Sequence, residues 1–297
     1  MTKRQKIIII CIVFAPVIIG IVLYNRDISG SGSNIPFGSQ GKKIGLVKIF
    51  DVIYWSEEYV RQLEELRKDN TVAGVIVRIN SPGGGVAPSQ EIYEEMMRYK
   101  EEKKPLVVSM GNVAASGGYY IASPAVKIFA NPGTITGSIG VIFQFPHYYE
   151  LFNKIGIKMT TIKAGKLKDV GNPNRDLTEK EKEYLQTLLD NTHEQFINDV
   201  SVAREMDIEQ LREIADGRIF TGEQAVGEGL IDSLGGFSEA LSYLRKYCDL
   251  PEKAKVIEKK KGPGFLKEVL NEGMVKNIPF FGRKIIPAGC YFLLENF

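Results

Sequence analysis

The run "VAGVIVRI" at residues 72–79 is the feature that most restricts the fold of this chain. A β-branched run of this kind is typical of a strand that is buried on both faces of a parallel sheet. Parallel strands need long crossover connections, which are usually helices. Strand-like and helix-like segments do alternate from residue 44 to about residue 250. We therefore predict an α/β fold in which helices cover a largely parallel sheet.

The remaining segments follow from periodicity and capping signals. The other predicted strands cover residues 43–50, 105–111, 126–130, 139–143 and 157–163. The predicted helices cover residues 56–69, 88–102, 116–122 and 178–205. Ser56 is the expected N-cap of the first helix, and Thr178 with Glu181 forms a capping box at the start of the longest one. One face of that longest helix is predicted to carry Leu185, Leu188, Leu189, Phe196 and Val200. A second capping box pairs Thr221 with Gln224.

Residues 7–24, "IIIICIVFAPVIIGIVLY", contain no charged side chain. As a helix this run would rise about 27 Å, close to the hydrocarbon thickness of a bilayer. Basic residues precede it, so the positive-inside bias places residues 1–6 in the cytoplasm and the rest of the chain outside the cytoplasmic membrane. A cleaved signal peptide is the alternative, but "VLYNRD" offers no small-x-small cleavage site. We predict a single-pass transmembrane anchor.

Three further regions follow the predicted anchor. Residues 25–42 include the Gly/Ser-rich stretch "SGSGSN" and are predicted to form a flexible linker. Residues 43–250 contain the alternating segments and form the main domain. Residues 251–297 are a C-terminal extension, first basic and then apolar, aromatic and interrupted by proline. We expect this extension to pack on its own domain or on a neighbouring subunit, with a membrane-surface contact as the alternative.

Composition excludes several classes of function. The net charge of +2 and the lack of a basic arm argue against a nucleic-acid partner. Two isolated histidines and three scattered cysteines give no metal-ligand spacing, so we expect neither a metal nor a cofactor. Cys248 and Cys290 are compatible with free thiols or with a disulfide, and the sequence does not choose between them.

The stretch "GNVAASGGYYIASPA" at residues 111–125 places Ser116 among small residues. Small neighbours let the backbone turn sharply and let another segment approach closely. A nucleophilic hydroxyl is often presented in this way, with the following amide free to bind an oxyanion. A serine hydroxyl is a weak nucleophile until a base removes its proton. The sequence therefore predicts a nucleophile at Ser116 and raises the question of its base.

Histidine and lysine are the two candidate bases. His193 falls within the long predicted helix, where we expect it to face water or to take part in packing, and His147 follows Pro146 at a predicted helix start. Neither lies in a loop of small residues, so histidine is the less favoured choice. Lysines are numerous, and the loop "KAGKLKDVGNPNRDLT" at residues 163–178 holds several beside glycine and proline. Spacing alone does not choose among them.

Five segments together resemble one known family. They are "RINSPGGGV" (78–86), "GNVAASGGYYIASPA" (111–125), "ANPGTITGSIGV" (130–141), "KAGKLKDVGNP" (163–173) and "GRIFTGEQAVGEGLIDSLGG" (217–236). In this order they are similar to the signal peptide peptidase A family of membrane-anchored serine proteases. The resemblance covers roughly residues 43–250 and marks them as a catalytic peptidase domain. It implies the crotonase-like, Clp-protease-like α/β superhelix of ββα units.

The resemblance also implies roles for individual residues. Ser116 is the expected nucleophile, and Lys168 in "KLKD" is the expected general base. In the family this lysine commonly follows an aromatic residue, whereas Leu167 precedes it here. Lys163 and Lys166 remain alternatives for the base.

Two more elements of the site follow from the same resemblance. Ser138 in "TGSIG" matches a serine that hydrogen-bonds the lysine and keeps it oriented, with an ordinary turn serine as the alternative. "SPGGG" matches the oxyanion loop of the family. The amide of Gly83 or Gly84, together with that of Gly117, is therefore expected to bind the oxygen of the tetrahedral intermediate.

A lysine that acts as a base must first lose its charge. The pKa of a free lysine is about 10.4, and lowering a pKa to about 7 costs roughly 4 to 5 kcal/mol. Desolvation or a nearby positive charge can supply that difference. Lys168 is therefore expected to lie buried in the assembled enzyme, with Asp169 directed elsewhere. Because similar single-domain proteins form rings, the resemblance implies a homo-oligomer in which neighbouring copies contribute serine and lysine to one site.

Taken together, the sequence predicts a membrane-anchored serine endopeptidase outside the cytoplasm. By resemblance, its expected substrates are cleaved signal peptides and other hydrophobic or unfolded segments. A crotonase-type enzyme acting on acyl-thioesters is one alternative, because "SPGGG" also suits an oxyanion hole for an enolate. A non-catalytic membrane scaffold that retains the fold is the other.

Overall fold

The computed structural model describes residues 41–259 and 291–293. The chain divides into two compact units, Met1–Gln40 and Gly41–Phe297. The first unit lies outside the described residues, and with it the predicted cytoplasmic tail, the predicted anchor at residues 7–24 and most of the predicted linker. Across the residues that the structure describes, no helix is both long enough and apolar enough to cross a membrane.

The described part of the second unit is built on one predominantly parallel sheet. Its eight strands follow the order β7-β6-β4-β2-β1-β9, with β5 beside β4 and β8 beside β5. They are β1 (Lys43–Phe50), β2 (Val72–Ser81), β4 (Leu106–Ala115), β5 (Lys127–Ala130), β6 (Ile135–Gly137), β7 (Ile219–Thr221), β8 (Ser233–Leu234) and β9 (Val256–Glu258). The β6–β7 pair is antiparallel, and the other pairs are parallel. Strand β4 pairs with β5 near its start and with β6 at its end.

Two short strands lie outside this sheet. Strand β3 (Gly83–Gly85) follows β2 after a single residue, and β10 (Tyr291–Leu293) pairs with it in an antiparallel direction. Together they form a two-stranded sheet. Both β9 and β10 belong to the C-terminal extension that begins at residue 251, so this extension contributes strands to the second unit.

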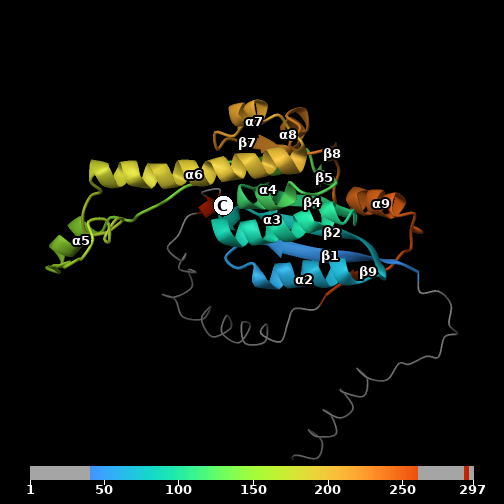
Figure 1. The fold of residues 1–297 in the computed structure, drawn as a ribbon, viewed down its shortest axis with the longest axis horizontal. Coiled ribbons are helices and arrows are strands. Elements are labelled where there is room, and N and C mark those ends of the chain that lie inside the picture. Colours follow the sequence, from blue (N-terminus) through green and yellow to red (C-terminus); the bar gives the residue numbers. More distant parts are fainter. Residues whose placement is uncertain (1–40, 260–290, 294–297) are drawn as a thin grey trace, which may run out of the picture. The chain divides into compact units, whose positions relative to one another are not determined.

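Helices cover both faces of the main sheet (Figure 1). They are α2 (Glu57–Lys68), α3 (Val86–Glu101), α4 (Gly117–Ala122), α5 (Tyr149–Lys154), α6 (Glu179–Arg204), α7 (Ile208–Ile214), α8 (Gly222–Gly227) and α9 (Phe237–Tyr247). The larger core lies between the sheet and α2, α3, α4 and α6. A smaller core lies on the opposite face, where Ala240 and Leu244 of α9 pack against Ile76 and Val107.

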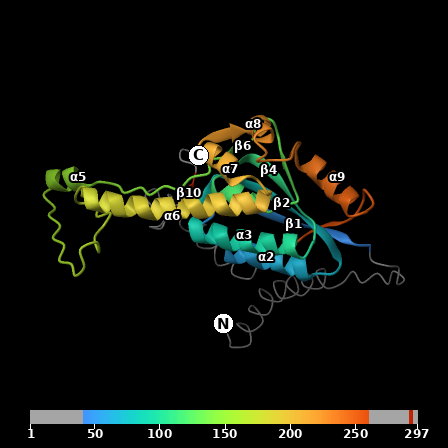
Figure 2. The ribbon, with the colours of Figure 1, turned by 45° about the horizontal axis from the view of Figure 1, so that its top comes forward.

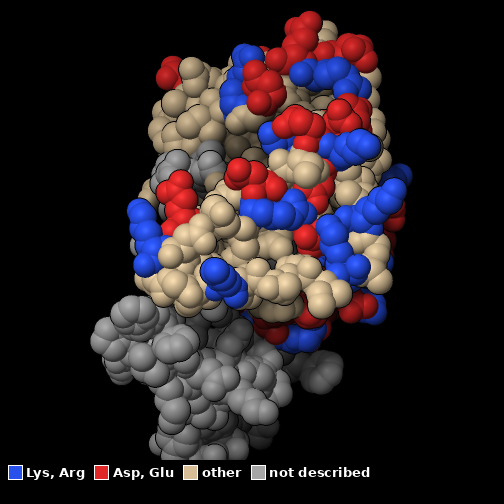
Figure 3. All heavy atoms as spheres, turned by 90° about the vertical axis from the view of Figure 1, so that its left-hand side faces the viewer, with Lys and Arg blue, Asp and Glu red and all other residues tan. Residues whose placement is uncertain are grey.

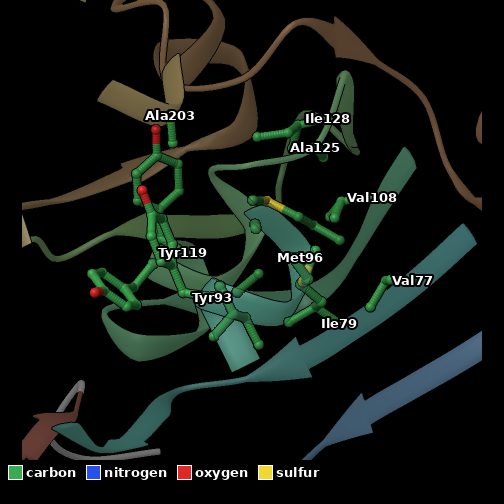
Figure 4. Packing of buried hydrophobic residues seen from close by; sticks show 14 of the residues in the cluster. Val77, Ile79, Tyr93, Met96, Val108, Tyr119, Ala125, Ile128 and Ala203 are labelled. Atoms are coloured by element: carbon green, nitrogen blue, oxygen red, sulfur yellow. The ribbon is translucent and has the colours of Figure 1, made fainter. Parts of the chain in front are cut away.

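The larger core explains the β-branched run of β2. Val77 and Ile79 point from β2 toward Met96 of α3 and Tyr119 of α4, and all four side chains are fully buried (Figure 4). Ile76 of the same strand belongs to the opposite core. Burial on both faces of β2 is what the sequence predicts.

The long helix α6 joins the body through its second half. Phe196 and Val200 are fully buried, and Phe196 makes an edge-to-face contact with Tyr120 at 4.9 Å between ring centroids. Leu188, which lies on the predicted face two turns earlier, is 40% exposed. The first half of α6 extends beyond the sheet (Figure 2) and is largely exposed, although Leu185 is buried.

Most predicted elements are confirmed to within a few residues, and two predicted strands are wrong. Residues 139–143 do not form one of the strands of the structure. The strand in that region is β6 (Ile135–Gly137). Residues 157–163 also form no strand, because this segment lies away from the sheet and is exposed throughout. Ser56 is the N-cap residue of α2, as predicted, but it makes no capping bond, since its hydroxyl instead contacts Glu91. Both predicted capping boxes are present.

Residues 148–190 form a projection that we call the arm. It contains α5, the loop that follows it and the first half of α6, and it extends to the left of the sheet in Figure 1. Tyr148 donates its backbone amide to the carbonyl of Pro173 at 2.8 Å, so the start of α5 lies beside the last part of the loop that follows this helix. Gly171 packs on the ring of Phe145, which lies just before the arm, and an added Cβ would stand 2.3 Å from that ring.

Candidate active site

Ser116 stands at the sharp turn from β4 into α4. Its φ of 51° and ψ of −118° are rare for a residue with a side chain, and such strain is characteristic of functional sites. The backbone holds this conformation from both sides. The Ser116 amide donates to the carbonyl of Gly137 at 2.7 Å, and the Ser116 carbonyl accepts from Tyr120 at 2.8 Å. The turn therefore presents the hydroxyl at the start of α4.

The hydroxyl of Ser116 is buried but has no bonding partner. Ser116 is 1% exposed, and its Oγ has no hydrogen bond among the described residues. Buried polar atoms almost always have a partner, so an unpaired one needs an explanation. A nucleophile whose base and substrate are supplied from elsewhere is such an explanation.

The glycine strand β3 approaches Gly117, the residue that follows Ser116. A Cβ added to Gly117 would lie 3.2 Å from Cα of Gly83 and 3.2 Å from the amide nitrogen of Gly84. It would also lie 2.8 Å from Oγ of Ser89, which is fully buried. Position 117 therefore needs glycine, because the two segments leave no room for a side chain. The structure brings together the three glycines that the resemblance assigned to the oxyanion site.

The backbone bonds of β3 distinguish between the two candidate amides. The Gly83 amide donates to Oγ of Ser81 at 3.1 Å. On one edge of β3, Ile53 donates to the Gly83 carbonyl and accepts from the Gly85 amide, each at 2.8 Å. Because backbone groups alternate along a strand, the amide and carbonyl of Gly84 lie on the opposite edge. Gly84 is therefore the preferred candidate, because its amide bonds neither Ser81 nor Ile53, and it lies on the edge of β3 that pairs with β10.

Ser138 lies directly beside the turn at Ser116. The β4–β6 pairing puts Ala115 opposite Gly137, and Ser138 follows that glycine. Ser138 has a φ of 53° and is 7% exposed, and its amide donates to the carbonyl of Arg218 at 2.8 Å. Two consecutive left-handed residues, Gly137 and Ser138, thus stand next to Ser116.

Lys168 lies on the arm, in the loop between α5 and α6, and is exposed. The buried Ser116 hydroxyl makes no bond to it. Among the described residues Lys168 forms no ion pair, whereas Lys163 contacts the carboxylate of Asp169 and donates to the carbonyl of Lys166 at 3.0 Å. The structure of a single chain therefore does not bring the predicted base to the predicted nucleophile.

A charged network fixes the loop that carries Lys168. Arg175 contacts Asp169 at 3.1 Å and Glu181 at 2.5 Å. Hydrogen bonds from Arg175 and Lys163 lower the pKa of Asp169 to about 2. A hydrogen bond from Arg175, assisted by the Thr178 backbone, lowers the pKa of Glu181 to about 2. Asp169 is thus directed toward Lys163 and Arg175 and away from Lys168.

This network predicts an unusually acidic carboxyl. Because the folded-state pKa of Asp169 lies below its ordinary value of 3.8, its ion pairs stabilise the loop above about pH 4 and are lost as the pH falls toward 2. Carbon-13 NMR of the Asp169 carboxyl should show a midpoint near 2. In Arg175→Gln the midpoint should rise toward 3.8, whereas Arg218→Gln, which removes the partner of Asp216, should leave it unchanged. A wild-type midpoint near 3.8 would contradict the network.

Neither histidine contacts Ser116. His193 is half-buried on α6, where its Nε2 lies 3.2 Å from the carbonyl of Ile139, the residue after Ser138. His147 lies 3.8 Å from the carboxylate of Asp176 and is exposed. His193 therefore packs near the site from the second half of α6, which fits the packing alternative of the prediction rather than the water-facing one.

Ser81 and Ser89 were not singled out by sequence reasoning. Ser81 accepts from the Gly83 amide, and its carbonyl lies 2.7 Å from where a Cβ of Gly118 would stand. Ser89 donates to the carbonyl of Gly85 at 2.9 Å. Ser81 stands within "NSPGG", but the sequence gives no sign that its side chain holds the loop.

Comparison with known proteins assigns this arrangement to a family. The model of peptidase family S49 matches residues 98–250, and that of the Clp proteases matches residues 51–134. The chain belongs to peptidase family S49. It is thus a protease of the signal peptide peptidase A family, and its parallel-rich α/β fold is consistent with a Clp-protease-like fold.

Relatives of this S49 protease differ in length. A Methanocaldococcus jannaschii protein whose name assigns it provisionally as a protease is 36% identical over 92% of this chain and 94% of its own length. An Enterococcus faecium protein, named provisionally as signal peptide peptidase SppA, is 41% identical over 70% of this chain and 60% of its own. Protease 4 of Salmonella typhi is 37% identical, and the match covers 64% of this chain but 31% of that protein.

Proposed function

We propose that this S49 protease is a membrane-anchored serine endopeptidase in which Ser116 is the nucleophile and Lys168 of a neighbouring copy is the general base. The single observation that carries the proposal is the buried and unpaired Ser116 hydroxyl on a strained backbone, at a turn where Gly84 closely approaches Gly117. Family membership supplies the reaction, which is peptide hydrolysis.

The chemistry follows from the positions of these groups. The Ser116 hydroxyl attacks the carbonyl carbon of the scissile peptide bond while the neutral amine of Lys168 accepts its proton. The amides of Gly84 and Gly117 donate hydrogen bonds to the oxygen that becomes negative. The lysine then gives its proton to the leaving amine, and an acyl ester forms on Ser116. Water, deprotonated by the same lysine, attacks the ester and releases the second product.

A neighbouring copy is needed because a single chain leaves the base exposed on its arm. Burial between copies would favour the neutral form of the Lys168 amine, since desolvation disfavours the charged one. The arm has the surface for such a contact. Its exposed apolar side chains are Tyr148, Tyr149, Leu151, Ile155, Ile157, Met159, Ile162, Leu167, Tyr184 and Leu188, and Ile162 is 97% exposed. Figure 3, which faces the arm end, shows extended uncharged areas between the charged groups.

The geometry of this contact favours a ring. The arm of one copy must reach the Ser116 site of another, so the two surfaces in contact are different. Such head-to-tail contacts form closed rings when the rotation between copies closes. Ser138 would meet the incoming lysine, because it stands beside Ser116 and its backbone is already fixed.

The proposed substrates are cleaved signal peptides and other hydrophobic or unfolded segments. The name of the Enterococcus faecium relative supports this class, as does the predicted anchor at residues 7–24, which would hold the domain at the outer face of the membrane. The Ser116 site requires extended chains, because its buried hydroxyl leaves no space for a folded domain.

Covalent labelling tests the proposal. A fluorophosphonate should add one phosphonyl group per reactive chain, and peptide mass mapping should place it on Ser116. Labelling should disappear in Ser116→Ala and fall strongly in Lys168→Ala, while Lys158→Ala, at another exposed arm lysine, should react like the wild type. Label found on another residue would exclude Ser116 as the nucleophile, and unchanged labelling of Lys168→Ala would exclude Lys168 as its base.

A further inference from the structure

Arg78 points from β2 to the face of the main sheet that carries the smaller core. Val77 and Ile79 point into the larger core (Figure 4), so the side chain between them takes the opposite face. Pairing of β1, β2 and β4 places Lys48, Arg78 and Ser109 in register on that face. The residues that β2 and β4 supply to the smaller core stand nearer the amino ends of these strands. This face is therefore apolar in its first half and polar from Arg78 onward.

The guanidinium of Arg78 is half-buried but has no acidic partner. Its Nη1 donates to Oγ of Ser109 and to the carbonyl of Met110, both at 2.7 Å. Within the described ranges, Nε and Nη2 make no hydrogen bond, and no carboxylate forms an ion pair with this side chain. Burial lowers the pKa of Arg78, and no acidic group offsets that effect.

Such a cation is unusual, because a buried charge is normally paired. Arg67, which is also buried, follows the rule and contacts Glu95 at 2.8 Å. On the face of Arg78, the carboxylate of Glu258 contacts Lys48 at 2.7 Å instead. The free donors of Arg78 are thus left for a group that the described part of the chain does not supply.

The free donors have the geometry of a carboxylate site. Nε and Nη2 form one edge of the planar guanidinium, with two parallel N–H groups that match the two oxygens of a carboxylate. Asn80 stands two residues further along the same face of β2. Its Oδ1 accepts from the amides of Asn112 at 2.8 Å and Val113 at 3.3 Å. This leaves Nδ2 of Asn80 as a further donor that has no partner among the described residues.

We propose that the Nε–Nη2 edge of Arg78, together with Nδ2 of Asn80, is a binding site for a carboxylate. The carboxylate comes from an acidic side chain of a second copy of this chain or from the carboxyl terminus of a peptide, and both sources present the same group. The site lies on the face of the sheet opposite α4, the helix that begins after Ser116. The inference therefore does not rest on the proposed function.

Chemical modification of the wild-type protein tests the site without a substitution. Phenylglyoxal reacts with accessible guanidinium groups, and peptide mass mapping gives the rate at Arg78. The probe is N-acetylglycylglycine, and its amide at matched ionic strength is the control. In single copies, obtained by dilution and verified by mass photometry, the acid at about four times its Kd should slow the reaction about fivefold, because only the unbound fraction reacts. Arg212, which is exposed and contacts Glu194, should react equally with both probes.

The assembled protein then distinguishes the two sources. A carboxylate from a second copy predicts that Arg78 reacts more slowly in the assembled protein than in single copies, even without a probe. A peptide terminus predicts equal rates in both states and protection of the assembled protein by the acid. Equal rates at Arg78 with the acid and with the amide in single copies would overturn the proposal.

Substitution of Asn80 by aspartate tests the second donor. Asn80→Asp keeps the oxygen that accepts from Asn112 and Val113 and replaces the Nδ2 donor by an anionic oxygen. The acid should then no longer protect Arg78, because like charges repel. Asn70→Asp, which makes the same charge change at an exposed position before β2, should retain the protection. Undiminished protection in Asn80→Asp would refute the site as proposed.

Discussion

Replacement of Ser116 by alanine should lower kcat for peptide hydrolysis by about 10⁴- to 10⁶-fold, because the acyl-enzyme route is lost. KM should change little, since the backbone that binds the peptide is untouched. Stability should also be retained. The Ser116 hydroxyl has no hydrogen-bond partner among the described residues, so its removal leaves no group unsatisfied. Steady-state kinetics and thermal unfolding of the same preparation measure both effects.

Ser123→Ala is the matched control for this substitution. Ser123 is fully buried at the other end of α4, where its hydroxyl donates to the carbonyl of Tyr120 at 2.8 Å. Its loss should cost about 1 kcal/mol of unfolding free energy and leave kcat within about twofold. A folded Ser116→Ala enzyme that keeps the wild-type kcat would show that Ser116 is not the nucleophile.

Replacement of Lys168 by alanine should lower kcat by at least about 10³-fold, because the hydroxyl would have no base to accept its proton. The substitution should leave the stability of the isolated domain within about 0.5 kcal/mol, since Lys168 is exposed in a single chain and forms no ion pair among the described residues. A large loss of activity without a loss of stability separates a catalytic role from a structural one.

Mixing of two inactive variants tests whether the site is shared between copies. In rings assembled from equal amounts of Ser116→Ala and Lys168→Ala chains, a site is complete where an intact serine meets an intact lysine. For random head-to-tail assembly, about a quarter of the sites meet this condition. Refolded mixtures should therefore recover up to about a quarter of wild-type activity. Mass spectrometry must confirm that the rings are mixed, and inactive mixed rings would rule out a shared site.

Local sequence was sufficient for most of the secondary structure. Successive side chains of a strand point to opposite faces of the sheet. An almost continuous apolar run such as that of β2 therefore predicts burial on both faces. The capping boxes of α6 and α8 are confirmed because their partners are three residues apart and meet as soon as the helix starts. The small residues around Ser116 likewise predicted a sharp turn, which depends on backbone sterics alone.

The remaining features of secondary structure and burial depend on contacts between segments that are distant in the sequence. Residues 157–163 have the alternation of a strand, but they form none because no strand edge lies beside them in the described structure. Leu188 belongs to the predicted apolar face of α6, yet it is exposed, whereas Leu185 of the same face is buried. The local pattern alone does not determine which of these side chains are covered.

The candidate site divides in the same way. The sequence alone determined a turn of small residues at Ser116, a run of three glycines and a lysine-rich loop, because each is a property of neighbouring residues. Tertiary structure decided that Gly84 and Gly117 meet, that Lys168 stays on an exposed arm and that the C-terminal segment pairs with β3. These outcomes depend on how the chain closes over long sequence separations, and local conformational preferences carry no information about such closure.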